Sequence, residues 1–225
     1  MSIGASVKAV IFDLDGVIVS TDNYHYRAWK ELADQYDIDF DRQVNERLRG
    51  VSRMDSLTIL LEKAKRYYSD EEKFQMMEEK NNRYREMLAE LTPNDILPGI
   101  PKLLLDLSVL GVKQAIGSSS KNAPYILRRI GMENHFDAVA DGNNIKNSKP
   151  HPEVFLLAAG MLGIPPERCI VVEDSIAGID AAIAAGMKSV AVGYACNYSK
   201  SDYAAKEPGS LEASRLIKLI ERDAN

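Results

Sequence analysis

Residues 7–25 read VKAVIFDLDGVIVSTDNYH, and this stretch decides how the rest of the sequence is interpreted. An apolar run, AVIF at 9–12, ends directly in two aspartates, Asp13 and Asp15, which are separated by one leucine. Packing gives no reason to place two carboxylates at the tip of a buried strand, because a buried charge costs free energy unless it is paired. We therefore expect a cation or an electrophile to meet Asp13 and Asp15, with Gly16 allowing the chain to turn there.

Four more short apolar runs follow along the chain, and helical patterns alternate with them. The runs are VKQAIG (112–117), DAVA (137–140), CIVV (169–172) and SVAV (189–192). Continuously apolar runs are typical of strands that are covered on both faces of a parallel sheet. Helical patterns occur at 101–111 and 175–186, and the second ends at Gly186, where glycine commonly closes a helix. The sequence thus predicts an α/β fold with a doubly wound, mostly parallel sheet.

Residues 20–92 interrupt this alternation because they contain helical patterns and no strand-like run. Apolar side chains from Ala28 to Tyr36 recur at helical spacing, and 57–91 is charged and amphipathic. We expect a helical cap domain at 20–92, inserted after the first strand into a core domain made of 1–19 and 93–225. The proline- and glycine-containing segment 92–99 is the expected return linker.

Composition narrows the class of protein. The 225 residues carry a formal net charge of −5, which argues against general binding to nucleic acids or anionic membranes. Cys169 and Cys196 lack CxxC spacing and are expected to be free thiols in a reducing compartment. No run approaches the roughly 20 apolar residues of a membrane span, and the N-terminus lacks the features of a secretory signal. We expect a cytoplasmic monomer with small-molecule partners.

Polar groups recur at the ends of four predicted strands or in the loops beside them. The carboxyl ends of the strands form the edge of a parallel sheet where ligands bind. Acidic oxygens suit Mg²⁺, and two carboxylates close together need a cation or a raised pKa. A serine run offers hydroxyl and N–H groups to an anion, and a lysine offers a counter-charge. This set predicts phosphoryl transfer. The four tips are Asp13-Leu14-Asp15-Gly16, Ser118-Ser119-Ser120-Lys121-Asn122, Ser148-Lys149-Pro150 and Glu173-Asp174-Ser175.

Each tip also has an ordinary structural explanation. The aspartates after the first strand could form a turn and a helix cap, and the serine run could be a plain loop. Lys149 could be a solvated surface charge, and Glu173-Asp174 could cap the helix that begins at Ser175. Taken singly, these explanations are the better ones. However, polar groups of these types occur at all four tips, and this coincidence indicates a reaction site.

The tips resemble the four motifs of the haloacid dehalogenase superfamily, in DLDGV, Ser118, Lys149 before Pro150, and Glu173-Asp174. Further segments are similar in order and spacing to the β-phosphoglucomutase family. The resemblance implies a mutase that interconverts β-D-glucose 1-phosphate and β-D-glucose 6-phosphate through an aspartyl phosphate and glucose 1,6-bisphosphate. A sugar-phosphate phosphatase of the same superfamily is the alternative. The further segments are YHYRAWKELA (24–33), LRGVSRMDSL (48–57), KNNRY (80–84) and SSSKN (118–122).

The resemblance also implies residue roles. Asp13 is the nucleophile and Asp15 the general acid/base, while Ser118 and Lys149 steady the transferring phosphate. Arg53, Ser120 and Asn122 hold the distal phosphate, and Gly50, Val51 and Lys121 complete that end. Magnesium is held by Asp13, the Asp15 backbone carbonyl and Asp174, with Glu173 beside them. The implied substrate-binding residues are Asp15, Thr21, His25, Trp29, Gly50, Val51, Arg53, Lys80, Ser118, Ser119, Ser120, Lys121, Asn122 and Lys149.

Two positions leave alternatives open, and a third departs from the family motif. His25 is equally well explained as part of a gate for Asp15 or as a helix residue that packs beside Trp29. Arg53 could instead be a surface cation paired with Asp55 or a neighbouring acid. Ser20 stands where the first motif of the family usually has another acidic residue.

Overall fold

The computed structural model describes residues 8–221 of the chain. Its centre is a six-stranded parallel sheet in the order β3-β2-β1-β4-β5-β6. Because β1 is flanked by β2 on one side and β4 on the other, the strand order reverses there and opens a crevice at the carboxyl ends. The strands are β1 (Ala9–Phe12), β2 (Lys113–Gly117), β3 (Ala138–Ala140), β4 (Cys169–Glu173), β5 (Lys188–Ala191) and β6 (Tyr203–Ala204).

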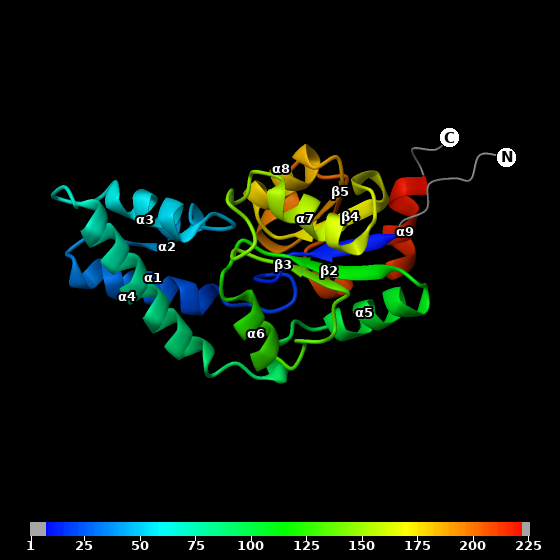
Figure 1. Cartoon of the computed structure of the whole chain (residues 1–225), viewed down its shortest axis with the longest axis horizontal. Helices are drawn as coiled ribbons and strands as arrows, with labels where there is room; N and C mark the ends of the chain where they lie inside the picture. Colours follow the sequence, from blue (N-terminus) through cyan, green and yellow to red (C-terminus); the bar gives the residue numbers. More distant parts are fainter. Residues whose placement is uncertain (1–7, 222–225) are drawn as a thin grey trace.

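Helices cover both faces of the sheet, which confirms the doubly wound α/β fold (Figure 1). Val10 and Phe12 of β1 pack into one apolar cluster with α5, α6 and α9, whereas Ala9 and Ile11 pack into another with α7 and α8. The alternation follows from the two-residue period of a strand. The core helices are α5 (Ile100–Val109), α6 (Ala123–Arg129), α7 (Glu153–Leu162), α8 (Ile176–Ala184) and α9 (Ala213–Glu221).

The five predicted strands and both predicted core helices are confirmed within one or two residues at each end. Gly186 follows α8 with a φ of 72°, as expected for a helix-closing glycine. The sixth strand was missed because two partly buried residues give no periodic pattern. Short 3₁₀ helices lie at Pro93–Asp95, Pro166–Arg168, Gly193–Asn197 and Pro208–Ser210.

Four helices form a separate apolar cluster at one end of the molecule (Figure 1). The helical pattern at 57–91 is not one helix, because the chain leaves α3 at Leu61 and enters α4 only after Ser69. Ser69 starts α4 with a capping box, in which Ser69 and Glu72 bond each other's backbone N–H groups. The limits 20–92 of a cap domain stay a prediction. The helices are α1 (Asp22–Gln35), α2 (Arg42–Glu46), α3 (Arg53–Leu61) and α4 (Asp70–Leu88).

The segment that leads from the core into these helices pairs with the segment that leads back from them to the core. Val19 and Ile96 form an antiparallel bridge, and the N–H of Leu97 donates to the carbonyl of Ile18 at 2.9 Å. This paired connection brings the helices over the carboxyl ends of the strands. Within residues 8–221, no helix is both long and apolar enough to cross a membrane.

Candidate active site

The turn after β1 places its two aspartates at the crevice. The N–H of Asp13 still donates to Val172 of β4 at 2.9 Å, and the chain then folds back at Gly16, whose φ is 80°. A Cβ atom at this glycine would lie 2.1 Å from Oδ2 of Asp174. Both the turn and the close approach therefore require glycine at position 16, as expected.

Lys149 lies at the centre of the buried charges. Its Nζ donates to Oδ1 of Asp13 at 2.6 Å and to Oε2 of Glu173 at 2.8 Å, and its side chain is 1% exposed. Burial lowers the pKa of Lys149, but the two carboxylates outweigh it and hold the pKa above the ordinary lysine value. The interpretation of Lys149 as a solvated surface charge is therefore wrong.

Asp13, Glu173 and Asp174 form an acidic cluster whose ligand atoms all lie within 4.8 Å of one another. Burial raises the pKa of Asp174 well above its ordinary value, and Glu173 adds to the rise. Burial also raises the pKa of Asp13, although Lys149 opposes it. Lys149, and Arg49 at 3.4 Å from Asp174, bring two positive charges to three buried acids, and hard carboxylate oxygens suit a divalent cation. The cluster therefore fits a metal such as Mg²⁺.

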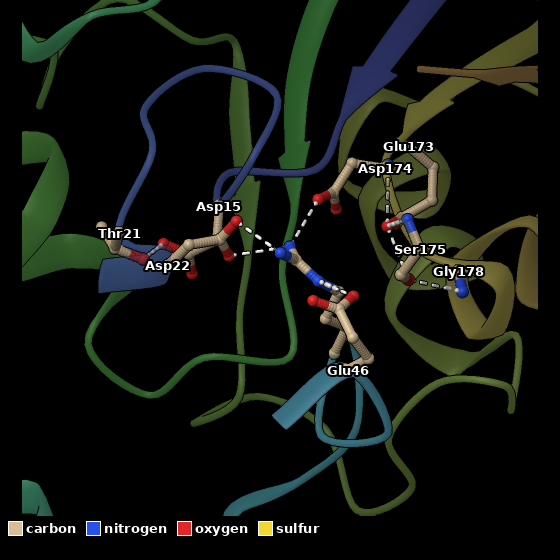
Figure 2. A network of polar contacts seen from close by, with 9 residues as sticks. Asp15, Thr21, Asp22, Glu46, Glu173, Asp174, Ser175 and Gly178 are labelled. Carbon is tan, nitrogen blue, oxygen red and sulfur yellow. Dashed lines mark hydrogen bonds and ion pairs between the residues drawn. The ribbon is translucent and has the colours of Figure 1, made fainter. Parts of the chain in front are cut away.

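Glu173 is the member of the cluster that does not line the pocket. Its Oε1 accepts from the N–H groups of Asp174 at 3.1 Å and Ser175 at 2.9 Å, and its Oε2 accepts from Lys149. Ser175 in turn caps α8 by accepting from the N–H of Gly178 at 3.0 Å (Figure 2). Because protein donors occupy both of its oxygens, Glu173 is placed to orient its neighbours. The cap of α8 is therefore Ser175, and the alternative in which Glu173-Asp174 cap this helix is wrong.

Asp15 faces the pocket, and the hydroxyl of Thr21 donates to its Oδ1 (Figure 2). Burial raises the pKa of Asp15 to about 6, and the hydrogen bond from Thr21 opposes that rise. A carboxyl with this pKa is suited to both accept and donate a proton near neutral pH. Thr21 is fully buried and does not line the pocket, so the structure places it against Asp15 and not at the predicted substrate surface.

The serine run after β2 forms one wall of the pocket, and all five residues from Ser118 to Asn122 line it. Oγ of Ser118 accepts from the N–H of Ser120 at 3.2 Å, and Oγ of Ser120 accepts from the N–H of Asn122 at 3.2 Å. The buried Oγ of Ser119 has no hydrogen-bond partner within the described residues. These bonds tighten the loop and keep its side chains at the pocket.

The opposite wall comes from α1 and α4. Lys80 is buried, with its Nζ 3.0 Å from Nδ1 of His25 and 4.9 and 4.4 Å from the ring centroids of Trp29 and Tyr84. Burial lowers the pKa of Lys80 well below its ordinary value, and Arg53 adds to this. The pKa of His25 is also well lowered, first by burial and then by Lys80. His25 therefore packs against the ring of Tyr84, with ring centroids 4.0 Å apart, and lines the pocket; packing beside Trp29 and gating both stay predictions.

The Gly-Val-Ser-Arg segment closes the helical side onto the core. Gly50 has a φ of 73°, and a Cβ atom there would lie 2.4 Å from Oγ of Ser175. Arg53 starts α3 and contacts Asn81 at 2.7 Å and Glu78 at 3.4 Å. Asp55 bonds with Ser52, so the acid that pairs with Arg53 is Glu78 and not Asp55.

Sequence reasoning missed Arg49, which joins the two parts of the molecule. Its guanidinium lies between Asp22 and Glu46 of the helical side and Asp174 of the core, at 2.7, 3.0 and 3.4 Å. Figure 2 labels these three acids. The side chain is 19% exposed. An arginine directly before Gly50 was the available signal, but two of its acidic partners, Asp22 and Asp174, lie 27 and 125 residues away in the sequence.

The pocket between the two walls has a volume of about 450 Å³. Every predicted site residue lines it except Thr21 and Glu173, which lie behind Asp15 and Lys149. Pocket residues that sequence reasoning did not name include Arg49, Tyr84 and Lys146. Ser20 is exposed and does not take part.

Known proteins share this sequence and arrangement. Residues 7–186 match the family described as haloacid dehalogenase-like hydrolase. The chain belongs to the haloacid dehalogenase-like hydrolase family. Within this family, it is 44% identical over 212 residues to a β-phosphoglucomutase of Bacillus subtilis, a match that covers 93% of this chain and 94% of that protein.

A crystal structure of a β-phosphoglucomutase from Clostridium difficile matches with a TM-score of 0.91 and 44% identity, over 96% of this chain and 98% of that one. The expected resemblance to the β-phosphoglucomutase branch of the family is therefore confirmed. Phosphatases of the family are more distant: a phosphorylated carbohydrates phosphatase of Thermotoga maritima is 33% identical over 82% of this chain and 84% of that protein.

Proposed function

We propose that this chain is a β-phosphoglucomutase that interconverts β-D-glucose 1-phosphate and β-D-glucose 6-phosphate. The observation that carries the proposal is a pocket with two different anion-binding ends. Asp13 and Lys149 lie at one end, and the cation of Arg53 lies with Asn122 at the other. A bisphosphate needs both ends at once, whereas simple hydrolysis of a monophosphate needs only the first. The identity to the curated mutase supports the same conclusion.

Asp13 is the proposed nucleophile. Its carboxylate attacks one phosphorus of glucose 1,6-bisphosphate, the bond from that phosphorus to the sugar oxygen breaks, and Asp15 donates a proton to the leaving oxygen. An aspartyl phosphate and a glucose monophosphate result. Ser118 and Lys149 lie beside Asp13 and are the proposed partners of the transferring oxygens.

The second half of the reaction runs in the opposite direction. A sugar hydroxyl attacks the aspartyl phosphate, and Asp15 accepts its proton, which re-forms the bisphosphate. The pKa of about 6 makes both protonation states of Asp15 accessible near neutral pH. The sugar must turn over between the two halves, so each end of the pocket must accept either phosphate.

Magnesium is the proposed cofactor, and the residues present fit it. Asp13, the backbone carbonyl of Asp15 and Asp174 would hold the ion, with Glu173 orienting the cluster. When bound, Mg²⁺ would neutralise negative charge on the transferring phosphoryl group. Arg49 and Lys149 approach the same cluster from the two sides of the pocket.

We also propose that the chain works as a cytoplasmic monomer on small sugar phosphates, without nucleic acid or membrane partners. One chain supplies every group that the proposed reaction uses. Cys169 and Cys196 are free thiols, which supports a reducing compartment. The net charge of −5 supports the absence of a nucleic-acid partner.

Phosphorus NMR tests the reaction directly. The enzyme is supplied with β-D-glucose 1-phosphate, Mg²⁺ and a trace of glucose 1,6-bisphosphate, and the products are followed with time. Glucose 6-phosphate is the expected product. Inorganic phosphate in stoichiometric yield would instead identify a sugar-phosphate phosphatase, the activity named for the relatives that are 33–34% identical.

A further inference from the structure

We infer that Asn81, which lies outside the pocket, positions Arg53 and Asn122 so that together they hold the non-reacting phosphate of the substrate. The identity of that phosphate rests on the proposed function. Asn81 is a positioning residue in this account, because it does not line the pocket whereas Arg53 and Asn122 both do.

One oxygen atom joins the two sides of the pocket. Oδ1 of Asn81 accepts from a terminal nitrogen of Arg53 at 2.7 Å and from Nδ2 of Asn122 at 3.0 Å. Arg53 begins α3 on the helical side, Asn81 lies on α4, and Asn122 directly precedes α6 of the core. A shared acceptor sets the distance between the guanidinium and the amide, although the residues come from three distant parts of the chain.

Both partners keep donors for an anion. A guanidinium has five N–H donors in a fixed fork, and Asn81 engages only one of its terminal nitrogens. The Nδ2 group of Asn122 has a second hydrogen beyond the one given to Asn81. The remaining contact of Arg53, to Glu78, is 3.4 Å long and involves a carboxylate that is 50% exposed, so an arriving phosphate can replace it.

The neutral character of Asn81 is the decisive chemical point. Arg53 is only 24% exposed, and burial lowers its pKa despite the neighbouring carboxylate of Glu78. An amide orients the guanidinium and leaves its charge available, whereas a carboxylate at the same place would neutralise it and repel a phosphate. An aspartate has almost the same shape as an asparagine, so exchanging them isolates charge from packing.

The experiment compares Asn81→Asp and Asn81→Ala with wild type, using Asn82→Asp as the matched control. Asn82 is the next residue on α4 and is exposed. Two phosphoryl donors are used: glucose 1,6-bisphosphate, which has a second phosphate, and acetyl phosphate, which has none. The rate of aspartyl phosphate formation is measured over a range of each donor concentration, and thermal unfolding monitors the fold.

For glucose 1,6-bisphosphate, we expect Asn81→Asp to raise the half-saturating concentration by about tenfold or more, the size of one charge-assisted hydrogen bond. Asn81→Ala should raise it by a smaller factor. Both variants should react with acetyl phosphate at the wild-type rate, and Asn82→Asp should match wild type with both donors. A residue that only stabilised the fold would slow both donors alike.

Equal effects of Asn81→Asp on both donors, or no effect on either, would overturn the inference. So would an equal effect of Asn82→Asp. Failure of the proposed function is recognised separately, by wild-type enzyme that yields only inorganic phosphate. In that case, the effect of Asn81→Asp on the half-saturating concentration of glucose 1,6-bisphosphate, compared with its effect on acetyl phosphate, still decides whether Asn81 positions a distal phosphate site.

Discussion

Nζ of Lys149 lies 2.6 Å from Oδ1 of Asp13, and both side chains are almost completely buried at the carboxyl end of the sheet. The residues are 136 positions apart in the sequence. The same ammonium reaches Glu173 at 2.8 Å, so one cation balances part of the charge on two carboxylates. This contact places the proposed nucleophile beside the cation that is proposed to neutralise the phosphate it receives.

Replacing Lys149 with alanine should cost both stability and activity. Removing one partner of a buried ion pair leaves uncompensated charge, and we expect a loss of about 3–5 kcal/mol in the free energy of unfolding. Denaturant unfolding with the matched control Lys102→Ala, a 78% exposed lysine, measures this. If Lys149→Ala unfolds at the same denaturant concentration as the control, the pair contributes nothing to stability.

Replacing Asp13 with asparagine should abolish turnover, because an amide does not form an acyl phosphate. The check is intact mass spectrometry after mixing with acetyl phosphate and Mg²⁺, where wild type should gain one phosphoryl group and Asp13→Asn none. Phosphorylation of this variant would show that another residue is the nucleophile.

Replacing Asp15 with asparagine should separate phosphorylation from sugar chemistry. Acetate leaves without needing a proton, so Asp15→Asn should still become phosphorylated by acetyl phosphate. Its mutase rate should fall by about 10²- to 10⁴-fold, because the sugar oxygens lose their acid and base. A mutase rate near that of wild type would move the acid/base role to another residue.

The two half-reactions should have opposite pH dependence with a midpoint near 6. Attack of a sugar hydroxyl on the phosphorylated enzyme needs ionised Asp15, so its rate should fall as the pH drops through the pKa of about 6. Cleavage of the bisphosphate needs protonated Asp15, so its rate should fall as the pH rises through the same value. Rapid-quench measurements of each half-reaction from pH 5 to 8 test this. Parallel profiles in both directions would contradict the assignment.

Replacing Arg49 with glutamine should loosen the closed arrangement of the two parts of the molecule. The ion pairs of Arg49 are partly exposed, so we expect their loss to destabilise the closed form by about 1 kcal/mol. This corresponds to a factor of about 5 in the ratio of closed to open forms. Hydrogen exchange of the residues around the Val19–Ile96 bridge should become faster. Arg47→Gln is the matched control, because Arg47 has an exposed ion pair with Glu62 within the helical side. Equal exchange in the two variants would remove Arg49 from this role.

The local pattern of apolar runs that end in polar tips predicted the parallel sheet and the core side of the pocket, whereas the residues of the helical side, such as Arg53 and Lys80, were named only through the family resemblance. The run AVIF followed by Asp13 and Asp15 shows this pattern within a few residues. A strand that is buried on both faces is apolar along its length, and it needs polar residues only at the end that meets a ligand. The strand tip after β4, with Glu173 and Asp174, follows the same rule. The sequence did not predict β6, because a strand of two partly buried residues is too short to show a two-residue period.

The sequence by itself determined which chemical groups the molecule could bring to one edge of its sheet. Only the tertiary structure decided which of them face the pocket and which stand behind it: Thr21 supports Asp15, and Glu173 supports Lys149. It also decided the contacts that join the helical side to the core, Arg49 to Asp174 and Asn81 to Asn122. These contacts depend on how two separately packed clusters meet, and that relation has no local signature because the partners lie 125 and 41 residues apart.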